Sequence, residues 1–252
     1  MGCLRKYILF GVVATIMPGV PALAADMPEA YFDAPVVYEV ASNWYLRGDL
    51  GYKWYSAPDA SFDYTGYGNF EKESLADTGV VGLGFGYRFS PYFRTDFTLD
   101  YEWDSQFKGN LKCPDPCKNI YSTEYATIDA WTGLANFYWD IDLSGEGLAG
   151  FIPYLGAGIG FSNLTTSRVH YTNPDGSTGT WKGDSQTNLA WALMAGVSVP
   201  MSNNWIFDIN YRYLDLGDAQ SGKTLKQFDN ARIKYKDITA SEVRVGLRYM
   251  LQ

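Results

Sequence analysis

Hydrophobic and polar side chains alternate along most of the chain beyond residue 43, with a period of two residues. Residues 93–104 are the clearest case, because Phe93, Phe97 and Leu99 lie on one face and the other face carries five charges. Successive side chains of a β-strand point to opposite faces. The pattern therefore predicts a strand with one apolar surface and one charged surface.

The same alternation recurs in the segments 44–55, 81–89, 123–140, 151–162, 189–199, 205–213 and 243–251. The segment 123–140 is the least regular. If Trp131 and Phe137 lie on the apolar face, Asn136 lies on the polar face, as expected for its side chain. Leu134 and Tyr138 then also fall on the polar face, where they fit poorly. Helical periodicity and an apolar run long enough for a membrane helix are both missing after residue 25, so the sequence predicts an all-β protein.

The predicted connections alternate in length. Those at 56–76, 105–121, 164–187 and 216–237 are long, 141–150 is intermediate, and 90–92 and 200–204 are short. Aromatic residues gather near both ends of the predicted strands, as in the two girdles of an outer-membrane barrel. Together these features predict an eight-stranded antiparallel up-and-down transmembrane β-barrel, with both termini in the periplasm and four long loops outside the cell.

The first residues have the organisation of a secretory signal peptide. Arg5 and Lys6 are followed by the apolar segment 7–17 and by the small residues at 22 and 24. We expect a signal peptide over 1–24, a periplasmic linker over 25–42 and the barrel over 43–252. Loss of Arg5 and Lys6 changes the net charge from −8 to about −10, which disfavours a nucleic-acid partner.

Two of the three cysteines, Cys113 and Cys117, remain after export. In an oxidising compartment we expect them to close a small loop through a disulfide. Free thiols are one alternative. Half of a metal site is another, but no second cysteine pair or histidine cluster completes it.

The predicted polar face of the strands would line the interior of the barrel. An eight-stranded barrel is just wide enough for side chains to fill it, and desolvated charges are costly unless they are paired. The near balance of charge therefore predicts a paired plug rather than an open pore. The predicted interior charges are seven cations and six anions: Arg47, Asp49, Lys53, Arg88, Arg94, Asp96, Asp100, Glu102, Asp208, Arg212, Glu242, Arg244 and Arg248.

Three segments resemble the opacity-protein-like, porin-family surface antigens of Gram-negative bacteria. They are WYLRGDLGY at 44–52, PYLGAGIG at 153–160 and VRVGLRY at 243–249. The last strand also resembles the signal read by the outer-membrane assembly machinery, through Arg244, Gly246, Tyr249 and Leu251, although the usual final aromatic residue is replaced by Leu251 followed by Gln252. The resemblance implies an outer-membrane surface protein that contacts lipid, lipopolysaccharide and the assembly machinery.

Candidate catalytic chemistry is sparse. His170 is the single histidine, and we expect it in the third long loop, near Ser167, Asp175 and Asp184. A hydrolase needs a nucleophile within reach of a base that is oriented by a carboxylate. A polar loop contains such residues by composition alone. Haem ligation by His170 or a tyrosine is a weaker alternative. We expect no enzyme activity, cofactor or metal.

The leading functional hypothesis is a structural surface antigen that displays four loops, with adhesion to host or environmental ligands as one role. A narrow porin-like channel is the main alternative. A ligand-binding, haem-binding or lipid-modifying barrel is less favoured.

Overall fold

The computed structural model describes residues 43–64, 67, 69–112, 120–143, 150–223 and 231–251. The predicted signal peptide, the linker and both Cys113 and Cys117 lie outside these residues. No helix long and apolar enough to cross a membrane occurs in the described ranges. The strands are β1 (Trp44–Tyr55), β2 (Asp59–Phe62), β3 (Phe70–Leu75), β4 (Thr78–Arg88), β5 (Phe93–Lys112), β6 (Tyr121–Asp140), β7 (Ile152–Thr166), β8 (Val169–Thr172), β9 (Thr178–Trp181), β10 (Asp184–Pro200), β11 (Trp205–Gln220) and β12 (Ile233–Met250).

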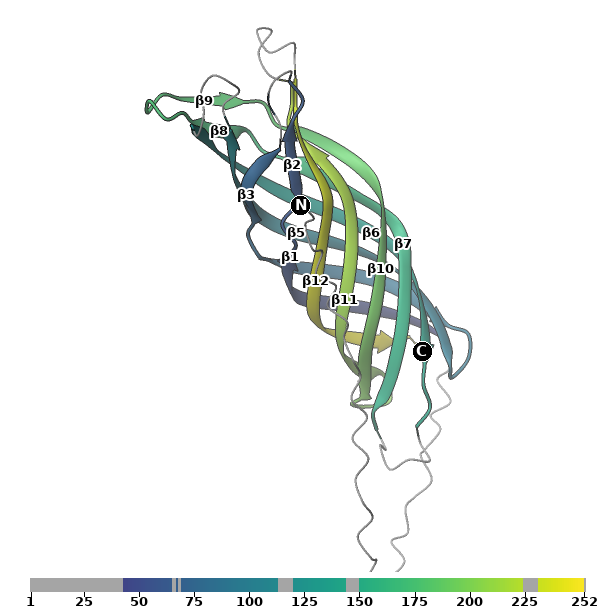
Figure 1. The fold of residues 1–252 in the computed structure, drawn as a ribbon. Helices are drawn as coiled ribbons and strands as arrows, with labels where there is room; N and C mark the ends of the chain where they lie inside the picture. Colours follow the sequence, from purple (N-terminus) through teal and green to yellow (C-terminus); the bar gives the residue numbers. More distant parts are fainter. Residues whose placement is uncertain are drawn as a thin grey trace, which may run out of the picture. The chain divides into compact units, whose positions relative to one another are not determined.

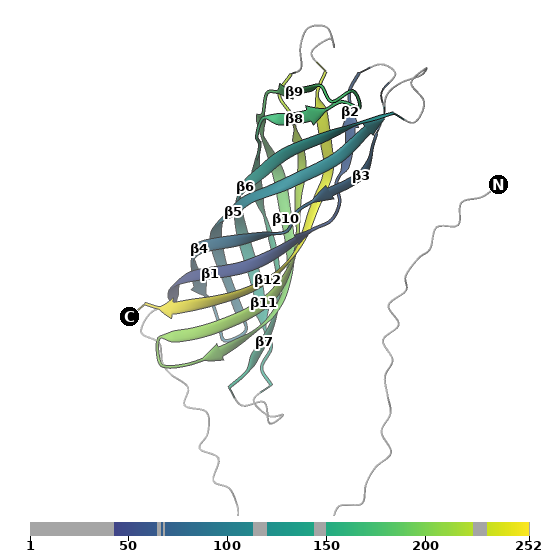
Figure 2. The same cartoon turned by 90° about the vertical axis from the view of Figure 1, so that its left-hand side faces the viewer.

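Eight long strands form a closed antiparallel ring (Figures 1 and 2). Each pairs with the next long strand in the order β1, β4, β5, β6, β7, β10, β11 and β12. The ring closes because β12 returns to β1, from Tyr45 opposite Met250 to Tyr55 opposite Ala240. The predicted all-β, antiparallel, up-and-down arrangement is confirmed.

The predicted long connections contain more structure than the sequence indicated. Four short strands, β2, β3, β8 and β9, extend the sheet at one end by pairing with β12, β5, β6 and β8 respectively (Figure 2). The long strands also run into the predicted connections, since β5 continues to Lys112 and β11 to Gln220. We call this region the headpiece; it comprises the four short strands with residues 105–112, 121–128, 215–220 and 233–238.

The strands expose their apolar face outward. Leu83 and Leu189 are 70% and 69% exposed, whereas the alternate side chains point into the ring and are mostly buried. The irregular segment follows the predicted register, because Trp131 and Phe137 are exposed on β6. Leu134 and Tyr138, which fitted poorly, are buried inside the ring.

Candidate functional site

The centre of the ring holds a buried ion-pair network around Asp100. One carboxylate oxygen of Asp100 accepts hydrogen bonds from Arg212 at 2.6 Å and from Arg244 at 2.9 Å, and the other accepts a second bond from Arg244 at 2.8 Å. Arg244 also donates to Glu242 at 3.3 Å. A Cβ atom at Gly82 would overlap Asp100 and Arg244, so glycine at this position gives the pair the room that it occupies.

Lys53 continues the network towards the headpiece. Its ammonium group lies 2.6 Å from Glu102 and 2.8 Å from Glu242. Glu102 also accepts hydrogen bonds from the hydroxyls of Tyr55, at 2.8 Å, and Thr132, at 3.0 Å. The central carboxylates are therefore shared between cations and neutral donors from several strands, which offsets the cost of burying them.

Arg47 anchors a second part of the network, nearer the end of the ring where β1 begins and β12 ends. Its guanidinium donates to Asp49 at 2.7 and 2.8 Å, to Asp96 at 2.9 Å and to the Tyr138 hydroxyl at 2.8 Å. The side-chain amide of Asn136 also donates to Asp96, at 2.8 Å.

Two more arginines complete this end of the interior. Arg94 pairs with Asp140 at 3.0 Å, and its guanidinium lies 3.9 Å from the centre of the Tyr138 ring. Arg248 donates to Asp208 at 2.6 Å and to the Ser198 hydroxyl at 2.7 Å. Charges from β1, β5, β6, β11 and β12 thus meet in bonded pairs.

The structure brings together all but one of the interior charges expected from the sequence. Every one except Arg88 is buried and belongs to an ion pair. Arg88 is half-buried and donates to the backbone carbonyl of Pro91. Sequence reasoning missed Asp140, although it continues the inward file of Asn136 and Tyr138. With Asp140, the six expected anions become seven and equal the seven expected cations.

The interior of the headpiece is apolar, which the sequence analysis did not predict. The ring of Trp181 stacks on Phe62 with centroids 5.2 Å apart, and Phe107 contacts both Phe70 and Tyr235 edge-on. The buried apolar side chains of this layer are Ala60, Phe62, Phe70, Leu75, Phe107, Leu111, Ala126, Ile128, Val169, Trp181, Leu216, Ala219, Ile233, Tyr235 and Ile238.

Glu124 is a buried carboxylic acid within this apolar layer. It is 1% exposed and accepts one hydrogen bond, from Ser122 at 2.9 Å. Among the described residues neither its second oxygen nor the Tyr235 hydroxyl has a hydrogen-bond partner. Burial raises the pKa of Glu124 from 4.5 to about 7. Burial and the nearby Glu124 also raise the pKa of Tyr235.

The headpiece is expected to loosen as the pH rises. The folded state holds the Glu124 proton more tightly than the unfolded state does. The contribution of this group to the stability of the headpiece is therefore greatest below pH 4.5 and falls as the pH rises to about 7. Hydrogen exchange of the backbone amides of β8 and β9 should therefore be faster at pH 8 than at pH 5, after correction for intrinsic rates. Glu124→Gln should abolish this difference, and persistence of the difference in that variant would contradict the assignment.

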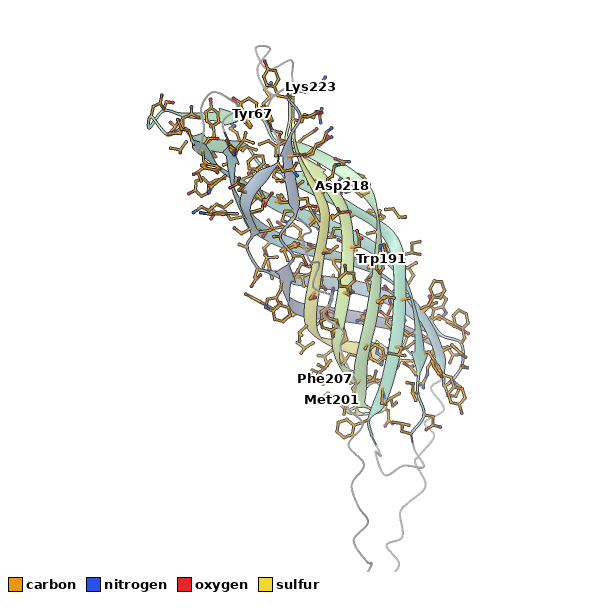
Figure 3. The ribbon with its side chains drawn as sticks, viewed as in Figure 1. Tyr67, Trp191, Met201, Phe207, Asp218 and Lys223 are labelled. Carbon is orange, nitrogen blue, oxygen red and sulfur yellow. The ribbon has the colours of Figure 1, made fainter. Side chains whose placement is uncertain are left out.

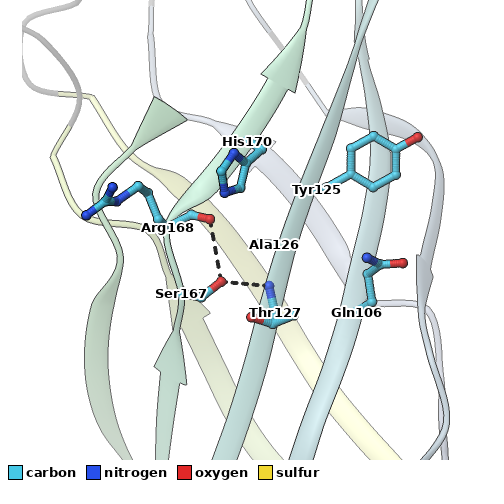
Figure 4. Close-up of a pocket in the computed structure, with 7 residues that line it drawn as sticks. All are labelled: Gln106, Tyr125, Ala126, Thr127, Ser167, Arg168 and His170. Atoms are coloured by element: carbon cyan, nitrogen blue, oxygen red, sulfur yellow. Dashed lines mark hydrogen bonds between the residues drawn. The ribbon is translucent and has the colours of Figure 1, made fainter. Parts of the chain in front are cut away.

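His170 lies on the short strand β8. From the sequence we expected it in the third long loop. Figure 4 shows it beside Ser167 and Arg168. The Ser167 hydroxyl bonds to the backbone of Thr127 and Arg168 and not to the imidazole, so the two residues do not form a nucleophile and base pair. In the described ranges, no group of three or more potential metal ligands converges.

The predicted assembly-signal residues Arg244, Gly246, Tyr249 and Leu251 lie on or directly after β12. The alternation places Arg244 inside the ring, and Tyr249 packs on Trp205 with ring centroids 4.9 Å apart. The Leu251 amide donates to the Trp44 carbonyl at 2.9 Å, so the last residues seal the junction with β1.

Comparisons with known proteins agree with this architecture. A protein of Brucella melitensis with no assigned role is 30% identical over 98% of both chains. A Rickettsia felis protein named "Putative adhesin" is 26% identical and covers 80% of this chain and 89% of its own. The crystal structure of OprG from Pseudomonas aeruginosa has a TM-score of 0.50 and 16% identity, covering 84% of this chain and 97% of that one. The profile of the outer membrane protein β-barrel domain family matches residues 11–250. The chain belongs to the outer membrane protein β-barrel domain family.

Proposed function

We propose that this chain is a non-catalytic surface protein whose eight long strands cross the outer membrane and carry the headpiece on the extracellular side. The filled interior is the observation that supports this role. Paired charges occupy the middle of the ring and stacked aromatic rings occupy the headpiece. Such an interior favours a rigid extracellular surface over a continuous aqueous path.

The outer face supports the membrane placement. Exposed aromatic side chains occur at two levels of the outer face. Trp44 and Trp139 lie at the end of the ring with the short turns, and Trp103 and Trp131 lie near the middle of β5 and β6, next to the headpiece. Figure 3 places Met201 at one end of the ring, Tyr67 and Lys223 at the other, and Trp191 between them. Aromatic belts are typical of the two membrane interfaces. The termini and short turns would then lie in the periplasm, where the assembly machinery reads the last strand.

Adhesion is the specific role that we favour for the displayed surface. The name of the Rickettsia felis relative supports this assignment. A rigid scaffold also lowers the entropic cost of binding through the loops that it carries. The partner would be a ligand on a host or environmental surface.

The purified protein is expected to show no stable open channel in planar lipid bilayers, because its interior charges are bonded to one another. Single-channel recording of the full chain tests this. Frequent, long-lived conductance steps whose ion selectivity changes in Arg94→Glu would contradict the scaffold and support the narrow channel. A deletion strain that loses surface attachment without a change in permeability would support the adhesin.

A further inference from the structure

A cavity of about 330 Å³ opens on the outer face where β7 ends and β8 begins (Figure 4). Pairing of β6 with β7 stops at Ile128 opposite Thr166, and pairing with β8 starts at Tyr125 opposite His170. The gap in the ladder leaves space between the strands. Ser167 lines the cavity and connects the two strands there, because its hydroxyl accepts a hydrogen bond from the Thr127 amide at 2.9 Å.

Basic side chains lie in and beside this cavity. Arg168 and His170 line it and are exposed on one side. Lys108 is not a lining residue, but it stands opposite Tyr125, which is, and its ammonium group lies 5.5 Å from the centre of the Tyr125 ring. Within the described residues none of these three basic side chains belongs to an ion pair, unlike the interior arginines. Gln106 and Thr127 add neutral hydrogen-bonding groups to the lining.

The height of the cavity places it in the polar layer of the outer leaflet, if the headpiece faces outward. Thr127 lies four residues from Trp131, which is about 13 Å along the strand at ~3.3 Å per residue. A strand tilt of about 40° reduces this to about 10 Å above the aromatic belt. Asp104 and Asp129 face outward between the cavity and the belt. Their carboxylates would repel an anionic group at their own level, so such a group would lie farther from the belt, at the level of the cavity.

We infer that this cavity binds the phosphorylated sugar headgroup of an outer-leaflet glycolipid. Arg168 and Lys108 would contact phosphate oxygens through charge-assisted hydrogen bonds. The ring of Tyr125 would pack against the apolar face of a sugar, and Gln106 and Thr127 would bond its hydroxyls. The site lies on the side wall near the membrane rather than at the tip of the headpiece, which favours a lipid over a soluble protein. This inference rests on the proposed orientation.

Titration of the detergent-solubilised full chain with fluorescent lipopolysaccharide, truncated to lipid A and its innermost acidic sugars, tests the site. The double variant Lys108→Ala with Arg168→Ala is expected to bind at least about tenfold more weakly, since it loses the charge-assisted bonds of both side chains. The control is Lys234→Ala with Lys236→Ala on β12, which removes the same charge elsewhere on the headpiece and should bind as the wild type does. Slower migration of every sample after boiling would verify that all are folded.

Three outcomes would overturn the site. Equal weakening by both double variants would indicate diffuse charge attraction, and equal affinity for phosphatidylglycerol would exclude recognition of the sugars. Displacement of the lipopolysaccharide by millimolar inorganic phosphate would point to a free anion instead. A separate experiment addresses orientation: an epitope inserted between Asp175 and Gly176 should bind antibody on intact cells. If it does not, the proposed orientation fails, whatever the purified protein binds.

Discussion

Replacing Asp100 by asparagine is expected to lower the free energy of unfolding by about 3–5 kcal/mol, the usual cost of removing one partner from a buried ion pair. The substitution preserves the size of the side chain but removes the charge that Arg212 and Arg244 share. Both guanidinium groups are no more than 1% exposed, so water cannot replace the lost carboxylate. Glu242, 3.3 Å from Arg244 and 3.8 Å from Arg212, also neutralises Lys53 and cannot compensate both arginines.

Urea-induced unfolding of the protein in phospholipid vesicles, followed by tryptophan fluorescence, measures this effect. Asp63→Asn is the matched control, because Asp63 pairs with Lys234 at 2.8 Å while 61% of its side chain is exposed. An exposed pair of this kind contributes less than about 1 kcal/mol. If both substitutions cost the same, the network does not stabilise the ring as argued above.

The orientation of the strands was predictable because lipid and the interior make opposite demands on alternate side chains. On β5 the inward positions Arg94, Asp96 and Asp100 are all buried, while Phe93 and Leu99 are exposed. Shifting the register by one residue would put these charges into lipid, so the sequence specifies it strongly. The partners of each charge were not predictable. Arg47 bonds to its own strand neighbour Asp49 and also to Asp96 on β5, and that choice depends on the three-dimensional stagger of the strands.

The headpiece was missed because the alternation changes phase where it begins. A β-bulge between Glu102 and Ser105 leaves Trp103 and Asp104 both exposed, after which odd-numbered residues such as Phe107 face inward. A search for a constant period of two therefore ends at the bulge. β11 shows the same effect, with irregular pairing at Gly217. Beyond these irregularities the inward apolar residues of β5 and β11 therefore stand at odd-numbered positions, such as Phe107 and Ala219, whereas the inward residues nearer the other end of these strands have even numbers.

Leu99→Arg is expected to reduce the stability of the folded protein in vesicles by roughly 2–4 kcal/mol, the cost of an arginine facing lipid near the bilayer midplane. Leu99 lies on β5 between the exposed rings of Phe93 and Trp103 and is 42% exposed. The cost arises because the guanidinium must either lose its water or draw water and headgroups into the apolar band.

Thr187→Arg is the depth control for this prediction. Thr187 also faces outward, but it lies on β10 beyond the exposed Leu189, and its hydroxyl accepts a hydrogen bond from Asn163 at 2.9 Å. Outside the apolar band an arginine reaches water or lipid phosphates, so its cost falls to about 0–1 kcal/mol. Unfolding in the same vesicles compares the two variants directly. A similar cost at both positions would mean that Leu99 does not face hydrocarbon, because only the bilayer makes the penalty depend on depth.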